Sequence, residues 1–172
     1  NGLIIQPRVL KTREEQTNRT KDKAEVFTPS WVCNAQNNLI DEVWFGRKDV
    51  FNHEYPETKT WTATTSPISF PDNKTWKDYV RSTRMEITCG EAPYLVSRYD
   101  TTTGEYIPIP QRIGMLDRKL RVISENATTT GEWLEMAQEA YKNIYGFEWQ
   151  GDNLLLAREA LLMTFIEYYT ER

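Results

Sequence analysis

The 172-residue chain is poor in the residues that bind metals or form covalent cross-links. It has two cysteines and one histidine, and Cys33 and Cys89 lack the Cys-x-x-Cys spacing of a zinc or redox site. We therefore expect reduced thiols, a cytoplasmic protein and no metal centre. The chain also lacks an apolar run of the roughly 18 residues that span a bilayer, so no membrane partner is expected. Residues 3–5 form too short an apolar run for a signal peptide.

The charge balance has no strong excess of either sign. A net charge of −4 does not indicate nucleic-acid binding by itself, and 39% apolar with 12% aromatic residues indicates a globular domain. Basic residues gather in residues 8–23 and again in residues 112–121. The second group could contact DNA phosphates by releasing counterions, and a solvated helix face is the alternative. Its candidate DNA-binding residues are Arg112, Arg118, Lys119 and Arg121.

A helix is predicted near the start of the chain by its capping residues. Thr28 fits an N-cap and Pro29 the first helical position, and the helix should end near Trp44. The apolar residues of this segment recur at helical spacing, so we expect them on its inward face. They are Val32, Ala35, Leu39, Ile40 and Val43.

Further along the chain, apolar patterns predict alternating helices and strands. The strands expected are 84–88 and 143–148, and residues 46–73 should form a loop with a short hairpin, with 58–62 as its better strand. Residues 93–109 fit either a helix opened by Pro93 or a β-hairpin. Helices are expected near Trp76, from Pro110, after the capping box that begins at Thr129, and after a cap at Asp152.

The most informative segment is Tyr145-Gly-Phe-Glu-Trp-Gln-Gly-Asp-Asn153, which precedes a Leu-rich run. It predicts a strand, an acidic residue at the strand's carboxyl end, a tight turn and a long helix. In doubly wound α/β folds, ligands lie beyond the carboxyl ends of strands, and an acidic side chain there can bind ribose hydroxyls. Glu148 is suitably placed, and a helix-capping or solvated carboxylate is the competing interpretation.

Two other segments, Glu25-Val-Phe-Thr-Pro29 and Glu86-Ile-Thr-Cys-Gly-Glu-Ala-Pro-Tyr-Leu95, occur upstream of Tyr145-Gly-Phe-Glu148. In this order the three resemble the cofactor-binding part of adenine-specific DNA methyltransferases of restriction-modification systems. In that family the first segment opens the catalytic domain, the second surrounds the methionine part of S-adenosylmethionine, and the third holds its ribose. The resemblance implies cofactor contacts from Phe27, Thr28, Pro29, Glu86, Cys89, Gly90 and Glu148.

The chain also departs from the family pattern. Ala92 replaces a loop glycine that lets the backbone approach the cofactor, Glu91 adds a negative charge beside it, and residues 97–142 form a long insertion. The chain has no Asn/Asp-Pro-Pro-Tyr/Phe tetrapeptide, the catalytic motif that holds a flipped adenine in that family. No catalytic residue is therefore assigned.

These observations predict an α/β fold with a Rossmann-like, methyltransferase-type parallel sheet, incomplete and interrupted by an inserted hairpin or helices. Residues 1–23 would form an arm, and residues 24–172 the front part of a longer cofactor-binding domain. The expected function is S-adenosylmethionine-dependent adenine methylation of DNA in a restriction-modification or defence system, with DNA and a restriction or specificity subunit as partners. The alternative is a catalytically silent methyltransferase-like module that binds DNA or a partner subunit. A different small molecule in the same crevice is a third interpretation.

Overall fold

The computed structural model describes residues 27–172. The predicted arm, residues 1–23, lies outside the described part, as do Glu25 and Val26 of the Glu25–Pro29 motif. The helices within it are α2 (Ser30–Phe45), α3 (Trp76–Arg81), α4 (Met115–Asn126), α5 (Thr130–Lys142) and α6 (Gly151–Glu171), with a 3-10 turn η2 (Ile109–Gln111). The strands are β1 (Asn52–Tyr55), β2 (Thr60–Ala63), β3 (Arg84–Ile87) and β4 (Ile144–Phe147).

The strands form two small sheets, so the fold is mixed α/β. Strands β1 and β2 form an antiparallel hairpin, while β3 and β4 pair in parallel from Arg84 opposite Ile144 to Ile87 opposite Phe147. Parallel neighbours need a long crossover, and residues 88–143 supply it with α4 and α5. The two predicted parallel strands are confirmed. The described residues place no third strand beside them, so the wider methyltransferase-type sheet is not part of the observed fold.

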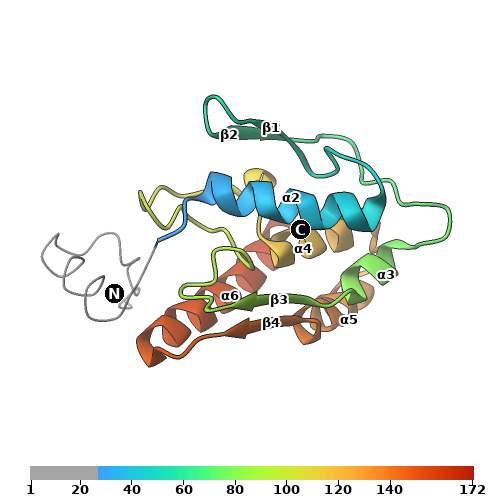
Figure 1. The fold of residues 1–172 in the computed structure, drawn as a ribbon. Helices are drawn as coiled ribbons and strands as arrows, with labels where there is room; N and C mark the ends of the chain where they lie inside the picture. The colour runs from blue at the N-terminus through green and yellow to red at the C-terminus, as the bar shows by residue number, and fades with distance from the viewer. Residues whose placement is uncertain (1–26) are drawn as a thin grey trace, which may run out of the picture.

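Helix α2 lies between the β1–β2 hairpin and the β3–β4 pair (Figure 1). Its predicted inward face is wrong: Val43 is 85% exposed, and Leu39 and Ile40 are exposed as well. The residues that α2 buries are mostly polar, namely Ser30, Cys33, Asn34, Asn37, Asp41 and Phe45. The apolar and the polar residues of α2 both recur at helical spacing. The polar residues face inward because they bind polar groups on other elements, such as Arg118 of α4.

Several predicted element boundaries also differ from the structure. Helix α2 begins one residue later than expected, at Ser30, and the helix predicted from Pro110 begins at Met115 after the η2 turn. Residues 93–109 form neither a helix nor a full hairpin, because their extended pairing is a single bridge from Tyr99 to Tyr106. The N-cap of α6 is Gln150, so Asp152 lies within the first turn.

The core lies around α4, whose apolar residues Leu116, Leu120 and Ile123 are fully buried, as predicted. Helices α5 and α6 pack against it through residues such as Trp133 and Ala160, and an aromatic group adds Phe45 and other rings at the end of α2. No helix in the described part of the chain combines the length and apolar character needed to cross a membrane.

Candidate functional site

The carboxyl ends of β3 and β4 meet at one edge of their sheet. The ladder continues past β3, where the Cys89 N–H donates to the Phe147 carbonyl at 2.9 Å. A Cβ atom at Gly146 would lie 3.1 Å from the Cys89 sulfur, so glycine lets the loop after β3 close over β4. The segments that follow both strands are therefore in direct contact.

Glu148 joins these two segments. Its Oε2 accepts a hydrogen bond from the Gly90 N–H at 2.7 Å, and its Oε1 accepts one from the Gln150 N–H at 2.8 Å. The side chain is half-buried. A carboxylate offers about four acceptor positions, so Glu148 holds the loop after β3 and keeps capacity for ligand hydroxyls. Its neighbours Phe147 and Trp149 are exposed instead of packing into the core.

Glu86 supports the other end of the same loop. This buried carboxyl accepts hydrogen bonds from the backbone N–H groups of Tyr94 and Leu95, the latter at 3.2 Å. Burial raises the pKa of Glu86 to about 8, and the nearby charge of Glu148 also raises it. The loop of residues 88–95 is thus held by one carboxylate near its beginning and by another at its end.

The backbone of this loop is left-handed at three alternate positions. Thr88, Gly90 and Ala92 have φ values of 55°, 55° and 62°, a region that costs an L-residue roughly 1–2 kcal/mol. Ala92 is fully buried, and its carbonyl accepts from the Leu95 and Val96 N–H groups at 3.1 and 2.9 Å. Ala92 therefore keeps a glycine-like conformation, in a loop whose strain is typical of functional sites.

The start of α2 is held by the segment that follows this loop. The Ser30 N–H donates to Asp100 Oδ2 at 2.7 Å, and the Thr101 hydroxyl donates to the Thr28 carbonyl at 2.8 Å. The predicted N-cap role of Thr28 is therefore wrong: Pro29 occupies the N-cap position, and the Asp100 carboxylate satisfies the helix N–H. Phe27, Thr28 and Pro29 are all half-buried.

Two buried cysteines lie near the candidate site, Cys33 on α2 and Cys89 in the loop after β3. The Cys33 thiol and the Tyr94 hydroxyl are hydrogen-bonded, and Cys33 lies within electrostatic reach of Glu86 and Asp100. Burial raises the pKa of Cys33, and it raises the pKa of Cys89 to about 12. Both are therefore neutral thiols at pH 7, which gives neither of them nucleophilic character.

The structure thus brings together four of the predicted cofactor-binding residues, Glu86, Cys89, Gly90 and Glu148. Cys33 of α2 lies close to this group, within electrostatic reach of Glu86. Tyr94 and Asp100 make these connections and were not singled out from the sequence. Tyr94 could have been identified as the aromatic end of the second phrase, whereas the contact of Asp100 with α2 spans 70 positions and leaves no local signal.

The predicted solvent-facing basic group of residues 112–121 is wrong. Arg112 is buried and its Nη2 lies 2.6 Å from Glu167 Oε2. Arg121 is half-buried, pairs with Glu125 at 2.7 Å and donates to the Thr64 carbonyl at 2.7 Å. These guanidinium groups bind the protein's own carboxylates and carbonyls, so they do not form a surface for phosphates.

Lys119 is also fully buried. Its Nζ donates to the carbonyls of Ser82 and Asn143 at 2.5 and 3.2 Å, residues that shortly precede β3 and β4. Burial, together with the nearby charge of Arg84, lowers the pKa of Lys119 to about 7 against the opposing charge of Asp41. Lys119 therefore ties α4 to the amino-terminal ends of the two strands.

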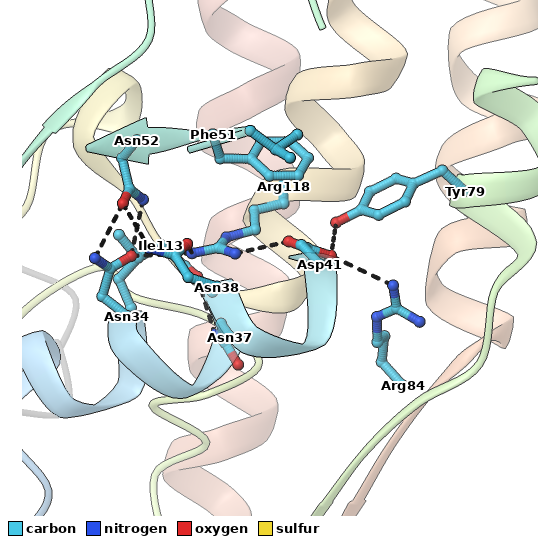
Figure 2. Close-up of polar contacts among 12 residues, drawn as sticks. Asn34, Asn37, Asn38, Asp41, Phe51, Asn52, Tyr79, Arg84, Ile113 and Arg118 are labelled. Atoms are coloured by element: carbon cyan, nitrogen blue, oxygen red, sulfur yellow. Dashed lines mark hydrogen bonds and ion pairs between the residues drawn. The ribbon is translucent and has the colours of Figure 1, made fainter. Parts of the chain in front are cut away.

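Arg118 is the centre of a buried polar network between α4 and α2 (Figure 2). Its Nη1 lies 2.6 Å from Asp41 Oδ2, and its Nη2 donates to the Asn34 and Asn38 side chains at 2.9 and 2.7 Å. The Phe51 ring lies 5.2 Å from the guanidinium carbon. This network is the reason why the polar stripe of α2 faces inward.

Asp41 receives two more donors in the same network. Tyr79 Oη donates to its Oδ1 at 3.0 Å, and Arg84 Nη2 lies 3.4 Å from the same oxygen. The spacing of Asn34, Asn37, Asn38 and Asp41 was a sequence signal for a second helical face. Its inward orientation required knowledge of Arg118, which lies 77 positions after Asp41.

A separate cleft of about 590 Å³ opens between the end of β2, η2 and the carboxyl ends of α4 and α6. Arg121 and Gln111 line it, and both side chains already make internal hydrogen bonds, for example from the Ala63 N–H to Gln111 Oε1 at 3.2 Å. The strand-end site therefore remains the better candidate. Comparisons with protein-family models, curated proteins and solved structures found no match to this chain.

Proposed function

We propose that this chain binds S-adenosylmethionine at the carboxyl ends of β3 and β4, as the cofactor-binding part of an adenine-specific DNA methyltransferase. The observation that carries the proposal is the position of Glu148, which directly follows β4 and bonds to Gly90 in the loop after β3. Acidic side chains at such strand ends bind ribose hydroxyls in doubly wound folds.

Each residue of the site would have its own role in cofactor binding. Glu148 would accept hydrogen bonds from the two ribose hydroxyls through its unused lone pairs. The loop from Cys89 to Ala92 would lie along the methionine part of the cofactor. Glu86 would act indirectly, because its buried carboxyl is engaged by the Leu95 N–H and keeps the loop in position.

The alternative is a catalytically silent methyltransferase-like module that binds DNA or a partner subunit. It is favoured by Asp100, whose carboxylate already occupies the start of α2, a region that the resemblance gives to the cofactor. The 172 residues also contain no Asn/Asp-Pro-Pro-Tyr/Phe tetrapeptide, so we assign no residue to the target adenine. Cofactor binding separates the two proposals.

Calorimetric titration with S-adenosylmethionine tests the leading proposal. Replacement of Glu148 by alanine should weaken binding by about 1.5–3 kcal/mol, the range for hydrogen bonds to charged groups, or roughly ten- to hundredfold in Kd. Glu148→Gln keeps one acceptor oxygen and should lose less. Glu135→Gln, which removes an exposed carboxylate from α5, is the matched control and should leave the affinity unchanged.

Glu148 also holds the loop through Gly90, so thermal unfolding of each variant must accompany the titration. A folded Glu148→Ala protein with wild-type affinity would remove the central residue of the proposal. Wild-type protein that binds no cofactor at millimolar concentration would favour the catalytically silent module.

A further inference from the structure

Within residues 27–172, the β3–β4 sheet has one apolar face that no other element covers. Because Met85 is opposite Tyr145 and Ile87 is opposite Phe147, these side chains share a face, and the exposed Trp149 follows two residues after the end of β4. Each residue is about half exposed or more, and Trp149 is 94% exposed. We call these five residues the open sheet face.

The two faces of this sheet differ in their surroundings. Arg84 and Glu86, which alternate with the open-face residues of β3, are buried against the rest of the molecule. Parallel strands are normally covered on both faces. An apolar face of this kind that is exposed to water is typical of an interaction surface.

The area of the open sheet face is close to that of a stable interface. Aromatic side chains have roughly 150–250 Å² of surface each. At the observed exposures, three aromatic and two aliphatic residues offer on the order of 600 Å². Two such faces packed together would bury roughly 1,200 Å² in total, which is the lower limit of specific protein interfaces.

The face is also compatible with itself. All five of its residues are uncharged, so packing two copies together brings no like charges into contact, although the chain carries a net charge of −4. Self-association through one patch requires a patch that matches its own copy across a two-fold axis. An uncharged patch of aromatic and aliphatic side chains meets the electrostatic part of this condition.

We propose that the chain forms a two-fold symmetric dimer in which the open sheet faces of two copies pack against each other. The aromatic rings of Tyr145, Phe147 and Trp149 interdigitate between the sheets, as in sheet-on-sheet packing. This inference is independent of the proposed cofactor, because it depends on the outer face of the strands and not on the groups at their carboxyl ends.

Sedimentation analysis of the 172-residue chain from low to high micromolar concentration tests the proposal. We expect a monomer–dimer equilibrium. Phe147→Glu should weaken dimerisation by roughly 30-fold or more, because it buries an unpaired charge at the centre of the interface. Tyr145→Glu, three residues before Glu148, should have the same effect while leaving the far-UV circular dichroism unchanged.

Val43→Glu is the matched control, since Val43 is an 85% exposed apolar residue on α2 outside the proposed interface. It should leave the dimerisation constant unchanged. A wild-type chain that is monomeric over the whole concentration range overturns the proposal. A dimer that tolerates both strand variants but dissociates in Val43→Glu also overturns it, because the contact would then lie on α2.

Discussion

Two of the carboxylate centres in residues 27–172 are stabilised in opposite ways. At the α2–α4 contact, Asp41 is bound by the guanidinium groups of Arg118 and Arg84, at 2.6 and 3.4 Å. At the ends of β3 and β4, Glu86 and Glu148 lie near each other, and their hydrogen-bond partners within residues 27–172 are backbone N–H groups. One centre offsets its negative charge with guanidinium groups, whereas the other is held by backbone N–H groups and has the pKa of Glu86 raised to about 8.

This difference separates a structural centre from a candidate functional one. A carboxylate paired with buried guanidinium groups has its charge compensated and fixes how two helices pack. Two carboxylates in one region, with the pKa of Glu86 raised by burial and by Glu148, are typical of sites where a ligand or proton completes the environment. The comparison can be tested by removing charges from each centre.

The largest effect is expected at the α2–α4 contact. Arg118→Ala leaves Asp41 buried with weaker compensation and should lower the free energy of unfolding by about 3–5 kcal/mol, as for other broken buried pairs. Arg158→Ala, which removes an exposed arginine from α6, should change stability by less than about 0.5 kcal/mol. Urea unfolding followed by circular dichroism measures both variants.

A double variant distinguishes the unpaired charge from lost packing. Arg118→Met with Asp41→Asn removes both charges of this pair, while the amide oxygen can still accept from Tyr79 and Arg84, so no buried carboxylate is left without its strongest partner. It should therefore be more stable than Arg118→Ala alone. If Arg118→Ala costs less than about 1 kcal/mol, the network is not the reason for the orientation of α2.

The strand-end centre should make the free energy of unfolding depend on pH. The pKa of Glu86 is about 8 in the folded protein against an ordinary value of 4.5, so the native state binds more protons between these values. This contribution to stability is fully present below pH 4.5 and is lost as pH rises through 8. Glu86→Gln should flatten the decline of unfolding free energy between pH 4.5 and 8, while Glu135→Gln should keep it. An unchanged slope in Glu86→Gln would mean that Glu86 titrates normally.

Much of the element pattern could be predicted from local sequence. The two parallel strands and the helix after Thr129 follow from short-range signals, because the Thr129 hydroxyl accepts from the Glu132 N–H at 3.1 Å within one turn. The orientation of α2 could not be predicted. Its apolar and polar stripes have the same period, and the choice between them depends on Arg118 from a distant helix.

The candidate site shows the same division. The pairing of Glu148 with the loop after β3 could be predicted from parallel topology, because carboxyl ends of adjacent parallel strands share an edge. The burial of the basic residues could not, since residues 112–121 have the composition of a solvated helix face. Their partners, such as Glu167 for Arg112, lie in the terminal helix and become visible only in the fold.

The smallest effect is expected from the loop alanine, and it has an internal control of the same chemistry. Ala92 and Ala137 are both fully buried, but Ala92 has a φ of 62° while Ala137 lies within α5. Ala137→Gly should cost about 1 kcal/mol, the helix penalty of glycine. Ala92→Gly relieves roughly 1–2 kcal/mol of left-handed strain against about 0.4–1 kcal/mol of added unfolded-state entropy. It should therefore leave stability unchanged or raise it slightly.

The same variant bears on the strand-end site, because removing the Ala92 methyl group lets the backbone of the loop approach a ligand more closely. We expect Ala92→Gly to tighten S-adenosylmethionine binding in the calorimetric titration, while Ala137→Gly leaves the affinity as it is. Equal or weaker binding in Ala92→Gly, at unchanged stability, would mean that the loop conformation held by Glu86 and Glu148 already accommodates alanine. The affinity for S-adenosylmethionine would then depend on the carboxylates of the strand-end centre and not on the Ala92 methyl group.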